Sequence, residues 1–225
     1  MFAPLFFIAC AIPGQPVALR AQAPTTPESL EAFVGRVLLS TRGAVTLRTI
    51  SDPVLPARVE WDFAGVARIE GVACERRAFA TDANIWGCQL ARMTATTFNL
   101  PTRTVASFSR ADGSLVQLVL PKSSSLQLGE LRCTGVIDLD HGTVTRCELA
   151  GAHRLRGVEL PAAAVLQFTI HGRLLSATIT GRTATAAGRT WGPEYTTCGV
   201  LDLRFGVDGR LVVPQADPLR EMCCD

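Results

Sequence analysis

The chain has 225 residues, of which 48% are hydrophobic and 19% charged, and its formal net charge at neutral pH is +2. This length can bury one sizeable core without help from a metal. The small net charge and the lack of a run of basic residues argue against a nucleic-acid partner.

Residues 1–12 are almost wholly apolar, and Pro13 ends the run. Residues 21–23 (AQA) then supply an A-x-A cleavage site, so the sequence predicts a secretory signal peptide at residues 1–23. The apolar run is too short for a transmembrane helix, and we expect no transmembrane segment. A competing interpretation makes Cys10 the lipid-bearing cysteine of a lipoprotein. Both interpretations place the protein in the periplasm or outside the cell.

The next segment predicts a short helix. Residues 25–28 (TTPE) have the composition of a helix start, because proline is tolerated at the first helical position and glutamate suits the positive end of the helix dipole. Apolar residues then recur at helical spacing from Leu30 to Leu38. In the competing interpretation residues 37–40 already form a strand. We favour the helix, followed by a strand that begins near Val45.

Cysteine spacing dominates the rest of the chain. Cys74 and Cys88 have thirteen residues between them, as do Cys133 and Cys147. The latter pair flanks β-branched arms and residues 140–142 (DHG), which predict a hairpin with a three-residue loop. The spacing allows directly opposed cysteines, so we predict one disulfide within each pair. No C-x-x-C motif is present, and we predict neither a metal nor a cofactor.

The two cysteine pairs belong to an internal repeat, because the second pair lies 59 positions after the first and apolar and turn residues match at offsets of 59 and 60. Repeat 1 covers about residues 74–120 and repeat 2 about residues 133–179. A partial copy spans 198–213, followed by a tail at 214–225. We expect residues 24–225 to form a single all-β domain, because a continuous repeat argues against the alternative, a domain boundary near Ser124.

The partial copy has only one cysteine of its own. We predict that Cys198 bonds Cys223 or Cys224 and so fixes the tail. Residues 122–125 and 181–190 are predicted loops. The predicted fold is therefore all-β, with repeated antiparallel β-hairpins in an extended meander after a short N-terminal helix. A closed β-barrel or a sandwich is the alternative.

The hairpin repeat with G-x-L turns, as in Gly113-Ser114-Leu115, resembles bacterial MORN-like repeat proteins across roughly residues 55–213. The chain departs from that family in lacking its Tyr-x-Gly pattern, since Tyr195 is its single tyrosine. The resemblance implies an elongated single-layer meander and a scaffold or binding role, with no catalytic residues to transfer.

Candidate binding residues are few. Trp86 and Trp191 would stack on a sugar or anchor a partner if they were exposed, and Arg76 and Arg77 would bind an anionic group. Residues 138–141 (DLDH) contain carboxylates and a histidine, but they suit an outward strand face and a turn better than a catalytic or metal cluster.

No catalytic residue is predicted, because the sequence has no G-x-S-x-G or H-E-x-x-H motif. The sequence therefore favours an exported scaffold or binding protein whose partner is a protein or glycan of the cell envelope. The alternative is a secreted hydrolase or inhibitor with its site in the loops.

Overall fold

The structure, a computed structural model, describes residues 19–22, 28–40, 45–50, 57–91, 100–155, 157–181 and 184–214. It is mostly β, with one α-helix, α1 (Leu30–Ser40), and one 3-10 turn, η1 (Pro193–Tyr195). The strands are β1 (Val45–Ile50), β2 (Arg58–Ile69), β3 (Val72–Thr81), β4 (Ile85–Leu90), β5 (Val105–Ser109), β6 (Leu115–Val119), β7 (Leu126–Leu128), β8 (Leu131–Asp140), β9 (Thr143–Leu149), β10 (His153–Leu155), β11 (Val158–Leu160), β12 (Val165–Phe168), β13 (Leu174–Thr180), β14 (Ala184–Ala186), β15 (Arg189–Trp191), β16 (Val200–Phe205) and β17 (Leu211–Val212).

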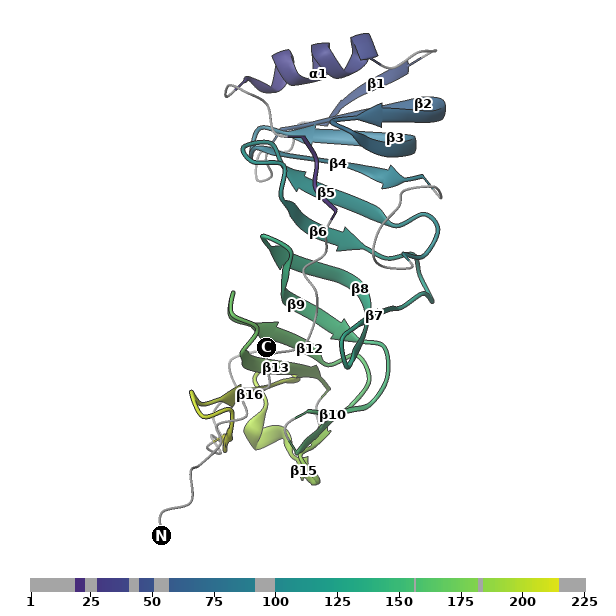
Figure 1. The fold of residues 1–225 in the computed structure, drawn as a ribbon. Helices are drawn as coiled ribbons and strands as arrows, with labels where there is room; N and C mark the ends of the chain where they lie inside the picture. The colour runs from purple at the N-terminus through teal and green to yellow at the C-terminus, as the bar shows by residue number, and fades with distance from the viewer. Residues whose placement is uncertain are drawn as a thin grey trace.

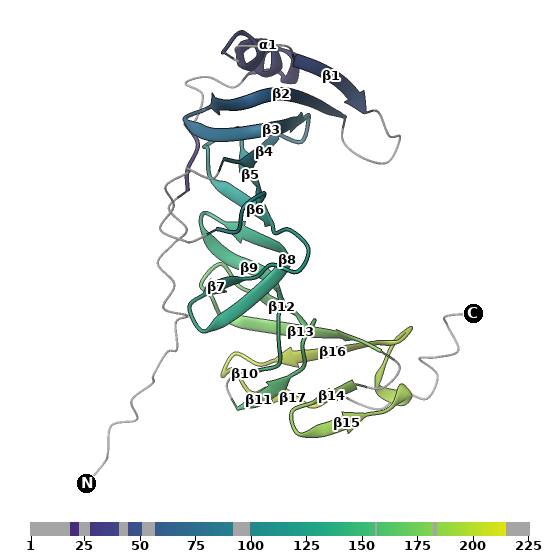
Figure 2. The ribbon, with the colours of Figure 1, turned by 90° about the vertical axis from the view of Figure 1, so that its right-hand side faces the viewer.

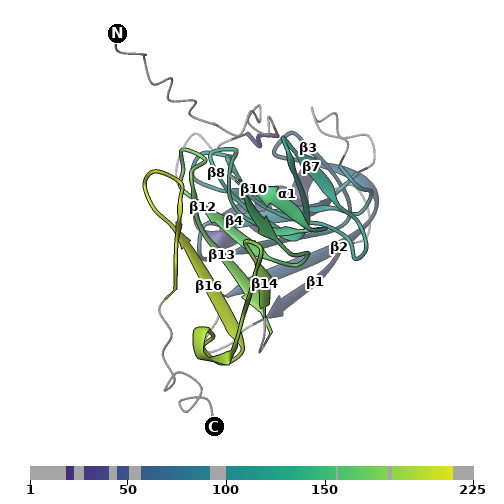
Figure 3. The same ribbon diagram turned by 90° about the horizontal axis from the view of Figure 1, so that it is seen from below.

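One antiparallel sheet of 13 strands organises the chain. Its order is β1-β2-β3-β4-β5-β6-β8-β9-β12-β13-β16-β17, with β7 added beside β8. The strands are stacked from α1 at one end to β16 at the other (Figure 1), and the view along the stack shows them lying beneath one another (Figure 3). Because β1 and β17 end the path without pairing to each other, the sheet is open. The predicted meander is confirmed, and the sheet is not closed into a barrel.

The predicted short helix is also confirmed, and the competing strand at residues 37–40 is wrong because these residues belong to α1. Ser29 caps the helix, since its hydroxyl accepts a hydrogen bond of 3.2 Å from the backbone N–H of Ala32. Residues 25–27 of the predicted start lie outside the described residues. The helix lies over β2 at the end of the stack (Figure 2). An ion pair joins Arg36 of the helix to Glu70.

The core follows from strand alternation, because side chains on one face of successive strands stand opposite one another. A row of paired residues crosses the sheet with at most 1% of each exposed: Trp61, Ala78, Cys88, Ala106, Leu118 and Ile137, continued by Cys147, Leu166, Ala177 and Leu203. At the helical end, Phe33 of α1 packs near Trp86, which stacks on Phe108 with ring centroids 4.8 Å apart. The row and these rings form one apolar core along the sheet.

Both predicted hairpin disulfides form. The Cα atoms are 5.7 Å apart for Cys74–Cys88 and 5.8 Å apart for Cys133–Cys147. The cysteines are not directly opposed, however. Cys74 stands opposite Leu90 and Cys133 opposite Leu149. Cys223 and Cys224 lie outside the described residues, so their predicted bond to Cys198 stays a prediction.

A bulge accounts for this register. In β3, residues 75–77 face only Gln89 of β4, and in β8, residues 135–137 face only Cys147 of β9. An extra pair of residues on one strand bends and twists the hairpin. The prediction of direct opposition allows for a loop of three or five residues, or a loop of two with a single bulged residue, whereas each bulge here holds two extra residues. Each disulfide therefore closes its hairpin diagonally across a bend.

Two predicted loops are also corrected. Asp140 pairs with Thr143, so the loop between β8 and β9 has two residues, His141 and Gly142, with φ of 47° and 84°. Two successive left-handed residues make the tight turn that matches the twist of a hairpin. The predicted loop at residues 181–190 contains a short hairpin of β14 and β15, which Trp191 anchors by donating to the carbonyl of Ala186.

Four residues of the predicted signal peptide, Leu19 to Gln22, are described and lie along the sheet. Leu19 and Ala21 are buried, and the N–H of Ala21 donates to the carbonyl of Gly113. Cleavage at the predicted site would remove these contacts from the mature protein. Among the described residues, no helix is both long and apolar enough to span a bilayer.

Candidate functional site

The outward face of the sheet carries a second row of paired residues, which we call the polar row. It consists of Arg48, Glu60, Phe79, Gly87, Ser107, Gln117, Asp138, Arg146, Gln167, Ser176 and Arg204. Neighbours in it interact directly. Gln117 donates to Asp138 at 2.8 Å, Asp138 pairs with Arg146 at 3.5 Å, and Ser176 donates to Gln167 at 3.3 Å. The row runs nearly the full length of the stack.

The polar row is interrupted at Phe79 and Gly87, where an aromatic ring and a glycine stand opposite each other. Here β2, β3, β4 and β5 form a pocket of about 650 Å³, which we call the arginine pocket. Its polar and aromatic lining consists of Arg58, Asp62, Phe63, Arg76, Arg77, Phe79 and Gln89.

The floor of the arginine pocket is fixed by a close fit between Phe79 and Gly87. A Cβ atom at Gly87 would come within 2.6 Å of both the backbone oxygen of Ala106 and the Phe79 ring, so only glycine fits between them. The guanidinium of Arg58 lies 4.0 Å from the centroid of the same ring, a cation–π contact, and its Nη2 pairs with Glu60 at 2.7 Å. The Nε atom of Arg58 is buried without a hydrogen-bond partner among the described residues.

The remaining charges belong to Arg77, Asp62 and Arg76. Arg77 Nε donates to Asp62 Oδ1 at 2.9 Å, and this hydrogen bond raises the pKa of Arg77 above its ordinary value. Within the described part of the chain, Arg76 makes no ion pair. Three guanidinium groups against the carboxylate of Asp62 give the lining a net charge of +2.

Arg76 also has an unusual backbone. Its φ is +67°, a left-handed conformation that residues with a Cβ adopt at a cost. The residue 59 positions later is Gly135, with φ of +63°, and the partial copy has Gly199 with φ of +69°. The bulge therefore has a left-handed residue in both full copies, and glycine fills it without strain in the second. Gly199 lies instead in a two-residue turn, which the pairing of Thr197 with Val200 closes. A positive φ is not confined to this site, because eight other non-glycine residues in the described part of the chain also have one.

The second copy lacks the other features of the pocket as well. At the same offset, Val136 replaces Arg77, and Asp138 and Arg146 replace Phe79 and Gly87. An ion pair thus stands in repeat 2 where the aromatic floor stands in repeat 1. The pocket is therefore a departure from the repeat and not a consequence of it.

Chemically, the arginine pocket is suited to binding an anion. Arginine remains protonated at all relevant pH values and presents its N–H groups in a planar fork that matches carboxylate and phosphate oxygens. Its lining has no serine or cysteine beside a histidine, the arrangement that activates a nucleophile. Arg76 and Arg77, which were predicted as binding residues, both lie here.

The predicted tryptophans lie elsewhere. Trp86 is 1% exposed and Trp191 is 2% exposed, so neither ring offers a face to a sugar. Trp86 is stacked on Phe108, and Trp191 packs edge-on against Tyr195 at 5.2 Å with Arg189 over its ring. Large aromatic rings stabilise the fold more when they are buried than when they are exposed, and both tryptophans belong to the core.

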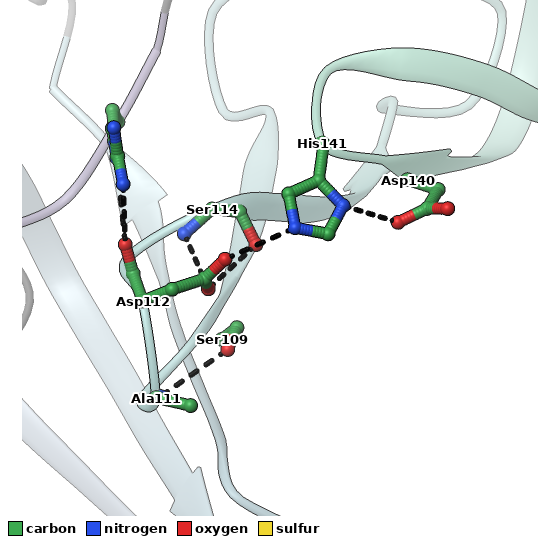
Figure 4. A network of polar contacts seen from close by, with 7 residues as sticks. Ser109, Ala111, Asp112, Ser114, Asp140 and His141 are labelled. Atoms are coloured by element: carbon green, nitrogen blue, oxygen red, sulfur yellow. Dashed lines mark hydrogen bonds and ion pairs between the residues drawn. The ribbon is translucent and has the colours of Figure 1, made fainter. Parts of the chain in front are cut away.

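A second polar cluster joins two turns at the edge of the sheet (Figure 4). His141 in the β8–β9 turn contacts Asp140 through Nδ1 at 2.6 Å and Asp112 in the β5–β6 turn through Nε2 at 3.3 Å. Ser114 donates its hydroxyl to Asp112 at 2.8 Å and not to the histidine. The order of contacts is therefore not that of a catalytic triad, in which histidine accepts from the serine. The predicted turn role of residues 140–142 matches this geometry.

The contacts in this cluster shift the pKa values of Asp112 and His141 in opposite directions. Burial alone would raise the pKa of Asp112, but hydrogen bonds from the backbone and hydroxyl of Ser114 and from Ser109, with the nearby His141, lower it to about 2. The hydrogen bond to Asp140 raises the pKa of His141, and the charges of both carboxylates add to the effect. The cluster links repeat 1 to repeat 2 across β6 and β8, which are paired.

No group of three or more histidine, cysteine, aspartate and glutamate side chains is placed to hold a metal ion within the described residues. Comparison with family models, with curated proteins and with solved structures found no match to this chain.

Sequence reasoning missed Arg58, Asp62, Phe79 and Gln89 as members of the pocket. Arg58 and Asp62 precede the first cysteine pair, so the repeat did not draw attention to them. The signal for Phe79 was present, because aligning the two copies sets Phe79 and Gly87 against the oppositely charged Asp138 and Arg146. A position where one copy departs from the other marks a site that the shared fold does not require.

Proposed function

We propose that this protein is an exported scaffold or binding protein of the cell envelope, which presents the outward face of its sheet to a protein or glycan. The observation that supports this most directly is the polar row, a line of hydrogen-bonding and charged side chains along the stack that is broken at Phe79 and Gly87 and buried at Ser107. A stack of hairpins that bury one face leaves an extended second face, the geometry on which repeat proteins bind their partners.

Export is supported by the two disulfides. Both are buried and each connects adjacent strands, as expected of structural cross-links in an oxidising compartment. The resemblance to MORN-like repeats points to the same kind of role. A hydrolase is not proposed, because the His141 cluster lacks the contact between serine and histidine that the chemistry needs.

The test is capture of a component from envelope extract by the oxidised, immobilised protein. The variant Gln167→Arg/Ser176→Arg adds bulk and charge to the polar row on β12 and β13, and it should abolish saturable capture. The matched control Gln127→Arg makes the same change at an exposed position of β7, off the row, and should retain it. Equal capture by the wild type and the polar-row variant would contradict the proposal, as would no saturable capture by either.

A further inference from the structure

We infer that the arginine pocket binds an acidic sugar unit, that is, a polyhydroxylated ring bearing a carboxylate or phosphate. This inference rests on the proposed binding function and specifies the chemistry that one part of the sheet face recognises. It depends on three observations: the volume of the pocket, the arrangement of its charges, and the restriction of these features to one copy of the repeat.

The volume fits a small organic group. About 650 Å³ falls within the roughly 300–1,000 Å³ typical of small-ligand pockets. The pocket interrupts the polar row, so a glycan that runs along the row would place one unit in it. Phe79, fixed over Gly87 and stacked against the guanidinium of Arg58, forms the base on which that unit would lie.

The charges select an anion that also carries hydroxyl groups. The guanidinium of Arg76 is unpaired among the described residues, and that of Arg77 uses Nε for Asp62, which leaves its terminal N–H groups for an oxyanion. Asp62 would repel a bare anion, but a carboxylate accepts hydrogen bonds from sugar hydroxyls. Gln89, whose amide donates to Glu75, keeps its carbonyl oxygen as a further acceptor.

Arg76 strengthens the inference because glycine would be the less strained residue at its position. The bulge of the second copy has glycine, Gly135, at the equivalent position with nearly the same φ. An arginine in that conformation places its side chain at the bulge, beside Arg77 and over the pocket. A structural requirement explains the left-handed backbone but not the arginine, and anion binding explains the arginine.

The experiment is calorimetric titration of the oxidised protein with four probes. Trigalacturonate carries carboxylates, its methyl ester has the same body without charge, glucose 6-phosphate carries the anion as phosphate, and inorganic phosphate has no sugar. We expect saturable binding of trigalacturonate, glucose 6-phosphate or both, with the tighter of the two showing whether the anion is carboxylate or phosphate. The methyl ester and inorganic phosphate should bind at least about tenfold more weakly, because each lacks half of the recognised chemistry.

The test variant is Arg76→Gly/Arg77→Val, which copies Gly135-Val136 of the second repeat and so keeps a sequence that this fold already accepts. Losing both guanidinium groups should weaken binding of the charged sugar about tenfold or more. The control Arg154→Ala removes an exposed arginine on β10 and should leave binding unchanged. Equal loss in the control would reveal a response to overall charge and would overturn the inference.

Two further outcomes would also overturn it: no binding of either charged sugar, or inorganic phosphate binding as tightly as the sugars. These results are distinguishable from failure of the proposed function. If the charged sugars do not bind but envelope capture still depends on the polar row, only the pocket inference is wrong. If capture fails as well, the proposed function fails with it.

Discussion

The left-handed backbone of Arg76 leads to a prediction about stability. The conformation costs a residue with a Cβ roughly 1–2 kcal/mol, and glycine avoids this cost but loses roughly 0.5–1 kcal/mol through its greater freedom in the unfolded chain. With φ of +67°, Arg76→Gly should therefore raise the free energy of unfolding by about 0.5–1 kcal/mol. For a chain of this size the melting temperature should rise by roughly 1–4 °C.

The reciprocal change should have the opposite sign. Gly135→Ala introduces a Cβ at φ of +63°, and that atom would lie 3.3 Å from Glu148 Oε2, a side-chain atom able to move. The same balance of terms then lowers the free energy of unfolding by about 0.5–1 kcal/mol. The two substitutions test one mechanism in both directions, at equivalent positions of the two copies.

The assay is urea unfolding of the oxidised protein followed by tryptophan fluorescence, since Trp61, Trp86 and Trp191 are at most 2% exposed and report on the core. Arg154→Gly serves as the control, because β10 is an ordinary strand in which glycine should destabilise by roughly 0.5–1 kcal/mol. If Arg76→Gly were destabilising by as much as this control, Arg76 would be making contacts that outweigh its strain, and the argument from φ would be refuted.

The remaining predictions concern the pocket floor, one disulfide and the polar cluster. Gly87→Ala should displace the ring of Phe79, destabilise the protein by about 1–3 kcal/mol through overpacking and abolish any binding in the pocket; calorimetry and thermal melting would show this, and an unchanged melting temperature would contradict it. The double variant Cys74→Ala/Cys88→Ala should lower the free energy of unfolding by about 3 kcal/mol on the chain-entropy model. Urea unfolding of the variant would be compared with that of the oxidised and the reduced wild type. A variant as stable as the oxidised wild type would count against a structural role for this disulfide. Because the hydrogen bond to Asp140 raises the folded-state pKa of His141 above its ordinary value, the stabilising effect of His141 is complete below that ordinary value and is lost as the pH rises through the folded pKa. His141→Asn, which keeps a residue that tolerates the left-handed turn, should remove this pH dependence in paired unfolding curves at acidic and alkaline pH, and persistence of the dependence would show that another group titrates.

The parts of the fold that the sequence predicts are those set by local pattern. Thirteen intervening residues, β-branched arms and a turn signal define a hairpin whatever its neighbours do, and the second copy repeats them. The pairing of Cys74 with Cys88 followed from that pattern alone. The order of strands also followed, because hairpins joined by short links pair with the next hairpin along the chain.

The site was less predictable because it depends on register. The bulge shifts which residues oppose each other, so the contact of Phe79 with Gly87 cannot be counted from spacing alone. The tryptophans illustrate a different limit. The alternation of side chains along a strand shows which residues share a face of the sheet with Trp86. It does not show whether that face is buried, because burial depends on what packs against it. Here α1, which precedes the repeat, contributes Phe33 to the contact with Trp86.

Both disulfides described here connect each cysteine to the next one along the chain, with sequence separations of 14. A polypeptide that enters an oxidising compartment from its N-terminal end exposes these thiols two at a time and in the native order. A simple dithiol oxidase acting on the emerging segment would therefore yield the native cross-links. Exchange among wrong partners, which slows the maturation of proteins with interleaved cysteines, is not required for these four residues.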